Sequence, residues 1–348
     1  MQLSFSGILF GSFQYRTDQA ARATNRFELE RAYLNFRMPA GDRTSIRVTT
    51  DVYQQQRSPE DSYYRGWSVR AKYAYIQHDY LNGKEWTGYA RLGMLNTVVI
   101  EHIESFWPRW MSQVAIERAG FFSSADLGLS AQLGLPRKLG EVIGVITNGP
   151  GYTSRETDRF KDYAARLSLT PMSNATTPLV KSLTLSFWGY KGAIASRFVA
   201  GGAGQSGSVN EGLSRDRYGI FAGVRDTRFS LGAEFARRED EGETGANTVL
   251  SPRAVQDSTG SVRSAFAMVR PLQLRNPKST VPLGLIARWD KVSPNTSADP
   301  SYDLYISGIT WDLSKRTILA LDYQVTVPDN GRPVPVNKTL FAHFVASF

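Results

Sequence analysis

The sequence predicts an all-β fold, a transmembrane antiparallel β-barrel of about sixteen strands with short periplasmic turns and long external loops. Three observations predict it. Apolar and polar residues alternate along the whole chain. Every second connection between the alternating segments is long and polar, whereas the others are mostly short. The 348 residues hold no run of about 18 apolar residues that could form a membrane helix, so only strands with one lipid-facing side could cross a bilayer.

The alternating segments each have about the 9–11 residues that a tilted membrane strand needs. The first carries apolar residues on alternate positions from Leu3 to Tyr15, and the second slips phase near Arg31, which predicts a β-bulge. The last alternates from Leu340 to Phe348, and its aromatic end resembles the recognition signal of the outer-membrane assembly machinery. In chain order the approximate ranges are 2–16, 25–38, 44–55, 66–78, 85–96, 125–135, 141–148, 161–170, 182–191, 216–225, 228–238, 260–270, 281–290, 301–313, 317–326 and 337–348.

Most segments in between also have an apolar face, which is expected to meet lipid. In chain order the faces that define them are Trp67, Val69, Ala71, Tyr73 and Tyr75; Trp86, Gly88, Ala90, Leu92 and Met94; Leu127, Leu129, Ala131, Leu133 and Leu135; Tyr163, Ala165, Leu167 and Leu169; Leu183, Leu185 and Phe187; Tyr218, Ile220, Ala222 and Val224; Phe229, Leu231, Ala233 and Phe235; Leu283, Leu285, Ala287 and Trp289; and Leu319, Leu321, Tyr323 and Val325.

The connections are of two kinds. Short ones such as 226–227 and 314–316 alternate with long polar ones, although 171–181 and 271–280 are long for turns. With a periplasmic N-terminus, all the long connections fall on the outside, which is the pattern of outer-membrane barrels. The long connections are 17–24, 56–65, 97–124, 149–160, 192–215, 239–259, 291–300 and 327–336.

Aromatic residues are predicted to form a girdle at each membrane interface. The expected location is therefore the bacterial outer membrane, in contact with its lipids and lipopolysaccharide. Because the chain opens directly on an alternating segment, we expect the mature form after removal of a signal peptide. The outer girdle has Tyr15, Phe27, Trp67, Tyr163 and Trp289, and the inner one has Tyr75, Trp86, Phe229 and Phe348.

Positions opposite the lipid faces should point into the lumen, and more of them are basic than acidic. Any barrel lumen is polar, and pairing of these charges would leave no net field. The alternative is that the basic excess gives a modest preference for phosphate-like anions, because charged rings select ions and guanidinium groups bind two oxygens at once. The whole chain carries a net charge of +9. The inward basic residues are Arg47, Arg70, Lys72, Arg91, Arg166, Arg217, Arg263 and Arg288, and the inward acidic ones are Glu28, Glu30, Asp51, Glu234 and Asp322.

The longest connection, residues 97–124, is rich in bulky side chains. A barrel of about sixteen strands leaves an aqueous channel that something must narrow. A loop folded into the lumen would do so, and we predict that 97–124 is a constriction loop. An external loop or a subunit contact is the alternative. Its charged residues are Glu101, Glu104, Arg109, Glu117 and Arg118.

Three stretches resemble the phosphate-selective porin O and porin P family. They are Asn25-Arg-Phe-Glu-Leu-Glu-Arg-Ala-Tyr-Leu, Leu92-Gly-Met-Leu-Asn-Thr, and Thr147-Asn-Gly-Pro-Gly-Tyr followed by Asp162-Tyr-Ala-Ala-Arg-Leu-Ser-Leu-Thr-Pro. The resemblance covers roughly the first half of the chain and the final strand. It implies a sixteen-stranded porin that forms a homotrimer, passes small hydrophilic solutes by passive diffusion, and has a third loop that constricts the pore.

Other functions have little support. There is no cysteine, and no catalytic signature surrounds His78, His102 or His343, so we expect no enzyme activity, cofactor or metal site. The basic residues are dispersed among strands, which argues against nucleic acid as a partner. Small anionic solutes are the expected partners. A barrel that anchors a larger envelope assembly or acts as a receptor, without transport, would show the same alternation and stays the alternative.

Overall fold

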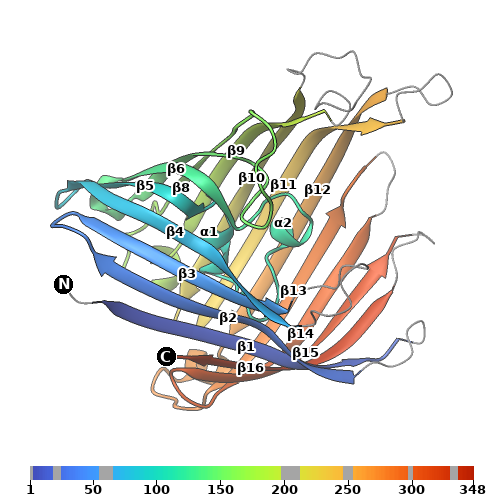
Figure 1. Cartoon of the computed structure of the whole chain (residues 1–348). Coiled ribbons are helices and arrows are strands. Elements are labelled where there is room, and N and C mark those ends of the chain that lie inside the picture. The colour runs from blue at the N-terminus through green and yellow to red at the C-terminus, as the bar shows by residue number, and fades with distance from the viewer. Residues whose placement is uncertain are drawn as a thin grey trace.

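The computed structural model describes residues 3–18, 25–54, 66–196, 212–245, 254–296, 301–329 and 336–348. Within these ranges sixteen antiparallel strands each pair with their neighbours in chain order, and β1 pairs with β16 to close a barrel. Both chain ends lie at the same end of the barrel (Figure 1). The strands are β1 (Ser4–Arg16), β2 (Asn25–Pro39), β3 (Thr44–Gln54), β4 (Trp67–Asn82), β5 (Thr87–Asn96), β6 (Ala125–Gly134), β7 (Gly140–Thr147), β8 (Asp162–Leu169), β9 (Thr184–Ala195), β10 (Gly212–Asp226), β11 (Phe229–Thr244), β12 (Ala254–Val269), β13 (Leu283–Ser293), β14 (Tyr302–Asp312), β15 (Thr317–Pro328) and β16 (Asn337–Ser347).

The last residue of the chain extends the pairing of β1 with β16 that closes the barrel. The backbone N–H of Gly7 donates to the carbonyl of Phe348 at 2.9 Å, and the N–H of Phe348 donates back to Gly7 at 3.0 Å. The Phe348 ring lies over Gly7, where an added Cβ would stand 2.3 Å from the ring. Both edges of the sheet are thus hydrogen-bonded, as a low-dielectric bilayer requires. The predicted all-β barrel is confirmed.

Three neighbouring strands extend furthest beyond their predicted ranges. β10, β11 and β12 have 15, 16 and 16 residues, so parts of the predicted connections 192–215 and 239–259 are strand. Their outer ends form the tallest part of the wall (Figure 1). There the sequence runs Arg237-Arg-Glu-Asp240 without alternation. We attribute this to water on both faces beyond the membrane, which removes the pattern that marks a strand.

Two β-bulges alter which side chains face the lumen. The predicted one is confirmed, because Phe10 pairs with Arg31 and Gly11 with Leu29, which skips Glu30. A second one is new: Thr49 pairs with Tyr73 and Thr50 with Ala71, which skips Lys72. Beyond it the alternation of β4 is inverted. Tyr73 and Tyr75 are therefore buried inside the barrel, and their predicted lipid-facing position is wrong.

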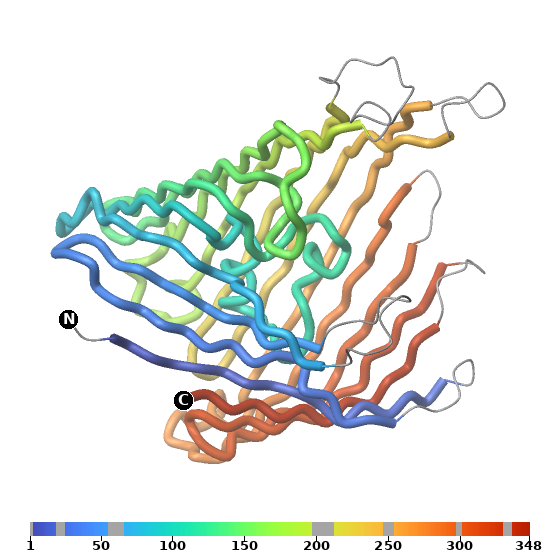
Figure 2. The backbone as a smooth tube through the Cα atoms, viewed as in Figure 1, coloured from blue at the N-terminus to red at the C-terminus, as the bar shows by residue number. Residues whose placement is uncertain are grey.

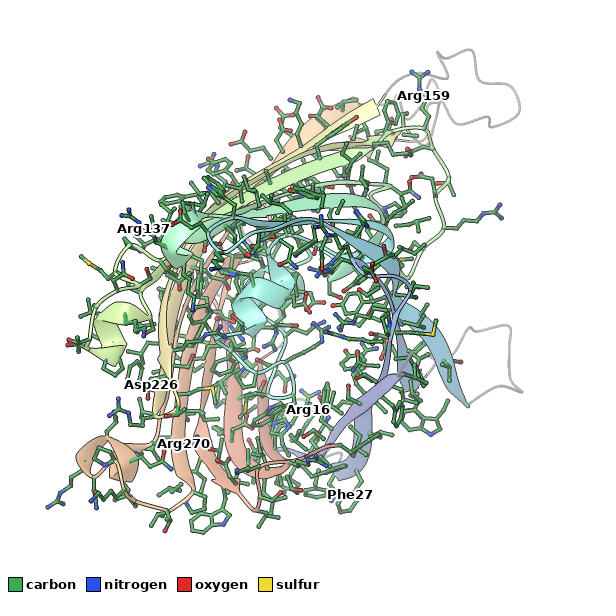
Figure 3. The ribbon with its side chains drawn as sticks, turned by 90° about the vertical axis from the view of Figure 1, so that its left-hand side faces the viewer. Arg16, Phe27, Arg137, Arg159, Asp226 and Arg270 are labelled. Atoms are coloured by element: carbon green, nitrogen blue, oxygen red, sulfur yellow. The ribbon has the colours of Figure 1, made fainter. Side chains whose placement is uncertain are left out.

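Residues 97–124 lie inside the barrel and contain two short helices, α1 (Ile100–Glu104) and α2 (Ala115–Arg118). Figures 2 and 3 show them surrounded by the strands. Three other short helical segments, at Pro136–Lys138, α3 (Pro178–Lys181) and α4 (Pro271–Arg275), lie in turns at the end that holds the termini. The last two explain the length of the turns 171–181 and 271–280. No helix in the described ranges is long and apolar enough to span a membrane.

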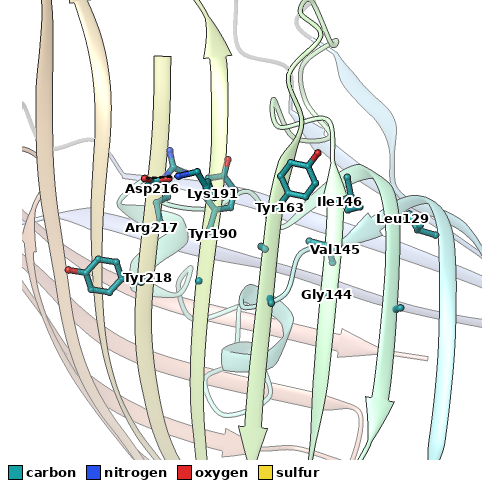
Figure 4. A pocket seen from close by; sticks show the side chains of 14 residues that line it. Leu129, Gly144, Val145, Ile146, Tyr163, Tyr190, Lys191, Asp216, Arg217 and Tyr218 are labelled. Carbon is teal, nitrogen blue, oxygen red and sulfur yellow. Dashed lines mark ion pairs between the residues drawn. The ribbon is translucent and has the colours of Figure 1, made fainter. Parts of the chain in front are cut away.

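The outer surface of the wall is apolar. On β6 to β9 a row of small residues, Ala131, Gly144, Ala165 and Gly189, runs in register from strand to strand. These residues line a shallow groove of about 790 Å³, and Lys191 and Asp216 form an ion pair of 3.6 Å at its rim (Figure 4). Exposed aromatic side chains stand at the outer strand ends, with Phe27 83 % and Tyr163 54 % exposed. This surface is suited to hydrocarbon.

Candidate functional site: the lumen and its internal loop

The internal loop, residues 97–124, is held by side chains from the wall that donate to its backbone carbonyls. Arg166 on β8 donates to Val98, and Arg217 on β10 donates to Phe121. Arg288 on β13 donates to Gln113 at 2.9 Å. The three anchors lie near the start, the end and the middle of the loop. Hydrogen bonds to charged donors are among the stronger ones in proteins, so these contacts fix the loop within the lumen.

Apolar packing reinforces the anchors. Ile100, Ile103 and Trp107 of the internal loop are completely buried. The Trp107 ring lies 5.3 Å from that of Phe266 on β12, measured between centroids. A glycine on β10 makes the close approach possible, since a Cβ at Gly223 would stand 2.9 Å from Phe106. This part of the lumen is a hydrophobic core.

Most acidic residues of the internal loop are neutralised within it. Arg109 forms ion pairs with Glu104 and, at 2.6 Å, with Glu117. Its Nε also donates to the Tyr33 hydroxyl on β2 at 3.1 Å. Burial alone would lower the pKa of Arg109, but Tyr33, Glu104 and Glu117 outweigh it and raise that pKa. Of the three loop glutamates Glu101 has the most exposed side chain, at 44 %, and its carboxylate lies 3.7 Å from the Arg47 guanidinium on β3.

Replacing Arg109 with methionine should destabilise the loop. The variant leaves the carboxylates of Glu104 and Glu117 buried without their cation, and breaking a buried ion pair in this way costs about 3–5 kcal/mol. We expect a lower Tm in detergent and noisier single-channel current. The matched control is Arg237→Met, which removes an external ion pair with about half-exposed partners and should change stability by less than about 1 kcal/mol. Equal Tm values for the two variants would contradict the role of Arg109.

His102 on α1 is a partly buried, neutral histidine. Its Nε2 lies 2.8 Å from Oγ of Ser186 on β9. Burial, followed by the positive charges of Arg166 and Arg225, lowers the pKa of His102 to about 3. It is a structural contact of the loop with the wall, and its imidazole has no carboxylate partner among the described residues.

Acid should weaken the docking of α1. Because the pKa of His102 is about 3 in the folded state and about 6.5 in the unfolded state, the unfolded chain binds more protons between these values. The free energy of unfolding should therefore fall as the pH drops below about 6.5, by at most roughly 4–5 kcal/mol near pH 3. His102→Gln should flatten this dependence in thermal melts, whereas the exposed His78→Gln should not. If the stability of wild type and of His102→Gln fell in parallel as the pH drops, the role of His102 would be contradicted.

The eight basic residues predicted to line the pore have different roles. Arg166, Arg217 and Arg288 are loop anchors, and each also pairs with a carboxylate, of Glu141, Asp240 and Asp290 respectively. Arg70 and Arg31 both pair with the fully buried Asp51, each at 2.9 Å. The three loop anchors are thus compensated one for one by protein carboxylates, whereas Asp51 carries one negative charge against the two positive charges of Arg70 and Arg31.

Arg263 does not face the lumen, and its predicted inward position is wrong. It pairs in register with Phe235 on β11 and Lys291 on β13. It is exposed, whereas its neighbours Val262 and Ser264 are buried. The prediction erred because β12 is longer than predicted and its phase could not be set from a weak apolar pattern.

The remaining three, Arg47, Lys72 and Arg91, lie on adjacent strands β3, β4 and β5. Arg91 donates to Gln77 at 2.9 Å and to Asn96 at 2.7 Å, and Lys72 donates to the Tyr33 hydroxyl at 3.3 Å. Among the described residues, only Arg47 has a carboxylate within 4 Å, that of Glu101. Of the predicted residues that face the lumen, Lys72 and Arg91 thus have no carboxylate within 4 Å in the described ranges, and we call Arg47, Lys72 and Arg91 together the basic wall.

Tyrosines that sequence reasoning did not single out stack against the basic wall. The Arg47 guanidinium lies 4.6 Å from the centre of the Tyr73 ring, and that of Arg91 lies 4.2 Å from Tyr89. Aromatic faces attract cations and hold them in place. The sequence did offer a signal, because tyrosines are frequent on β2 to β5. Alternation alone, however, assigned Tyr73 and Tyr75 to the lipid-facing side.

Open space remains between the internal loop and the strands β1 to β4, β15 and β16. One cavity of about 420 Å³ is lined by Arg118 from α2 and by Arg26, Glu28 and Glu30 from β2. Another of about 260 Å³ is lined by Arg47, Lys72 and residues of α1. A wider basin of about 1010 Å³ opens beneath α1 toward the end that holds the termini. No group of three or more His, Cys, Asp or Glu in the described ranges is arranged to hold a metal ion.

Comparison of the folded chain with solved structures gives matches over its whole length. An anion-selective porin from Comamonas acidovorans superposes with a TM-score of 0.66 at 9 % identity, covering 100 % of this chain and 99 % of the other. The Salmonella typhi OmpF complex with daunomycin gives 0.65 at 11 % identity, covering 99 % and 97 %. The outer-membrane channel DcaP of Acinetobacter baumannii gives 0.64 at 10 % identity, covering 100 % and 97 %. The fold is that of the outer-membrane porins.

The likeness lies in the fold rather than in the residues. No family model matches the chain, and comparison with curated proteins gives no match. At identities of about a tenth, the likeness shows the fold, whereas the solute must be argued from the lumen of this chain.

Proposed function

We propose that this chain is a porin of the bacterial outer membrane that passes small hydrophilic solutes by passive diffusion, with a modest preference for anions. The observation that carries the proposal is the basic wall, Arg47, Lys72 and Arg91, two members of which line the cavity beside the internal loop. Fixed positive charge on one side of a narrow aqueous path raises the local concentration of anions. The internal loop, residues 97–124, is the constriction in this proposal.

Planar-bilayer recordings test the proposal. Purified protein should insert as a conducting pore, and the reversal potential across a chloride gradient should have the anion-selective sign. Raising the salt should reduce the preference, because the Debye length of about 8 Å at physiological ionic strength shortens further. An absence of conductance from folded protein would favour a non-transporting barrel, and a cation-selective sign would reject the anion preference.

The proposed assembly is a homotrimer embedded among outer-membrane lipids and lipopolysaccharide, after removal of a signal peptide. Support comes from the apolar outer surface and from the stretches that resemble the phosphate-selective porin O and porin P family, to which we propose that the chain belongs. One solved structural neighbour is the trimer form of OmpT, an outer-membrane protein of Vibrio cholerae. The mass of the conducting species in mild detergent should equal three chains. A monomeric mass with conductance intact would count against the trimer.

A further inference from the structure

A bulge-built pocket lies between the barrel wall and α1. The β-bulge in β4 turns two consecutive side chains, Lys72 and Tyr73, to the inside of the barrel. Both line the cavity of about 260 Å³ beside the internal loop. Regular alternation would have sent one of them to the lipid, and bulges commonly re-aim side chains at functional sites. The bulge thus places an ammonium beside an aromatic ring.

Lys72 is buried without a carboxylate partner among the described residues. Its relative exposure is 3 %, and its Nζ lies 4.3 Å from the centre of the Tyr33 ring. An ammonium has three donors, and the described protein atoms accept one of them, at the Tyr33 hydroxyl. A buried charge without a counter-ion is unfavourable, so an anion beside Lys72 would be stabilised. Arg47 lines the same cavity and provides a second cation.

The other walls restrict which anion fits. Phe10, Tyr33, Tyr73 and Trp110 present aromatic rings to the cavity. Its charged lining is Arg47, Lys72 and Arg109 with Glu101 and Glu104. Arg109 is paired with Glu104 and with Glu117 behind the lining, and Arg47 lies 3.7 Å from Glu101. Within the described residues Lys72 is therefore the one lining cation with no carboxylate within 4 Å. A phosphate dianion would meet two carboxylates and leave the rings without a partner. A single negative charge attached to an apolar body matches both the charge and the rings.

We propose that this pocket binds small monovalent organic anions with an aromatic body, that is, aromatic carboxylates. The carboxylate lies between Lys72 and Arg47, and the ring packs against Tyr73 and Trp110. This inference rests on the proposed function in one respect, namely that the solute reaches the pocket by passing through the pore. The proposed site narrows the anion preference to aromatic carboxylates. The net charge of the chain indicates a preference for anions but no particular class of anion.

Two measurements with benzoate test the site, with acetate and inorganic phosphate as comparison anions. Benzoate should block the chloride current saturably, and at lower concentration than acetate or phosphate. Lys72→Met should raise the half-blocking concentration of benzoate at least about tenfold, as expected for the loss of a charge-assisted hydrogen bond. Lys315→Met, on the exposed turn between β14 and β15, is the matched control and should leave it unchanged. Tyr73→Leu should remove the advantage of benzoate over acetate.

Equilibrium dialysis of radiolabelled benzoate against detergent-solubilised protein measures the site without conduction. Saturable binding that Lys72→Met abolishes supports the site even if the pore does not conduct, in which case the proposed function alone fails. An anion-preferring pore without saturable benzoate binding overturns the site alone, as does tighter binding of phosphate. If Lys72→Met does not fold, an unchanged benzoate-to-acetate ratio in Tyr73→Leu also overturns it.

Discussion

Replacing residues 100–116 with a short Gly-Ser linker should raise the single-channel conductance severalfold and let larger solutes pass. The deletion removes α1, the Arg109 ion pairs and the first two residues of α2 from the lumen. The anchors from Arg166 to Val98 and from Arg217 to Phe121 remain, so the ends of the loop stay attached to the wall. Ionic current scales with the free cross-section of the narrowest region, and in the proposed function the internal loop forms that region.

The control for the loop deletion replaces residues 153–157 with the same Gly-Ser linker. These residues lie in the external connection 149–160, and most of the five are exposed. The control should leave the conductance unchanged. Heat resistance of the folded barrel in detergent should be measured for both proteins, because the deletion also removes the buried Ile100, Ile103 and Trp107. A folded deletion with wild-type conductance would refute the proposal that this loop sets the size limit.

Arg47→Glu combined with Arg91→Glu should shift the reversal potential toward cation selectivity. The two substitutions place negative charge on the basic wall, and neither wild-type side chain is a loop anchor. Arg47→Glu also brings a carboxylate close to Glu101, which lies 3.7 Å from Arg47 in the wild type. The shift should be largest at low salt, because exposed charges are screened over about 10 Å at 0.1 M.

Arg263→Glu is the matched control for charge reversal, because it makes the same change on the outer face. Alternation read from the sequence places Arg263 in the lumen, whereas the register with Phe235 and Lys291 places it outside. The control should leave the sign and size of the reversal potential unchanged. A shift in the control as large as that in the double variant, or no shift in the double variant, would contradict the assignment of the basic wall.

The sequence by itself determined the barrel. Alternation arises because one face of each strand meets lipid and the other meets the lumen. It can therefore be recognised without knowing which strands are neighbours. The number of strands, the order of long and short connections and the bulge near Arg31 could therefore be predicted. Alternation failed to predict the strand at Arg237 to Asp240, where water on both faces removes the solvent difference. It also failed on β4, where the bulge at Lys72 shifts the alternation by one residue.

Only the tertiary structure decided what the inward charges do. Arg166 and Arg91 both sit at inward positions, yet one anchors the internal loop at Val98 and the other stacks on Tyr89. The difference depends on where the internal loop lies, and its position is set by apolar contacts such as Trp107 with Phe266, which are 159 residues apart (266 minus 107). Sequence periodicity is a local property, whereas pairing between charges depends on distances of a few ångströms across the lumen, so it exists only once the barrel has closed.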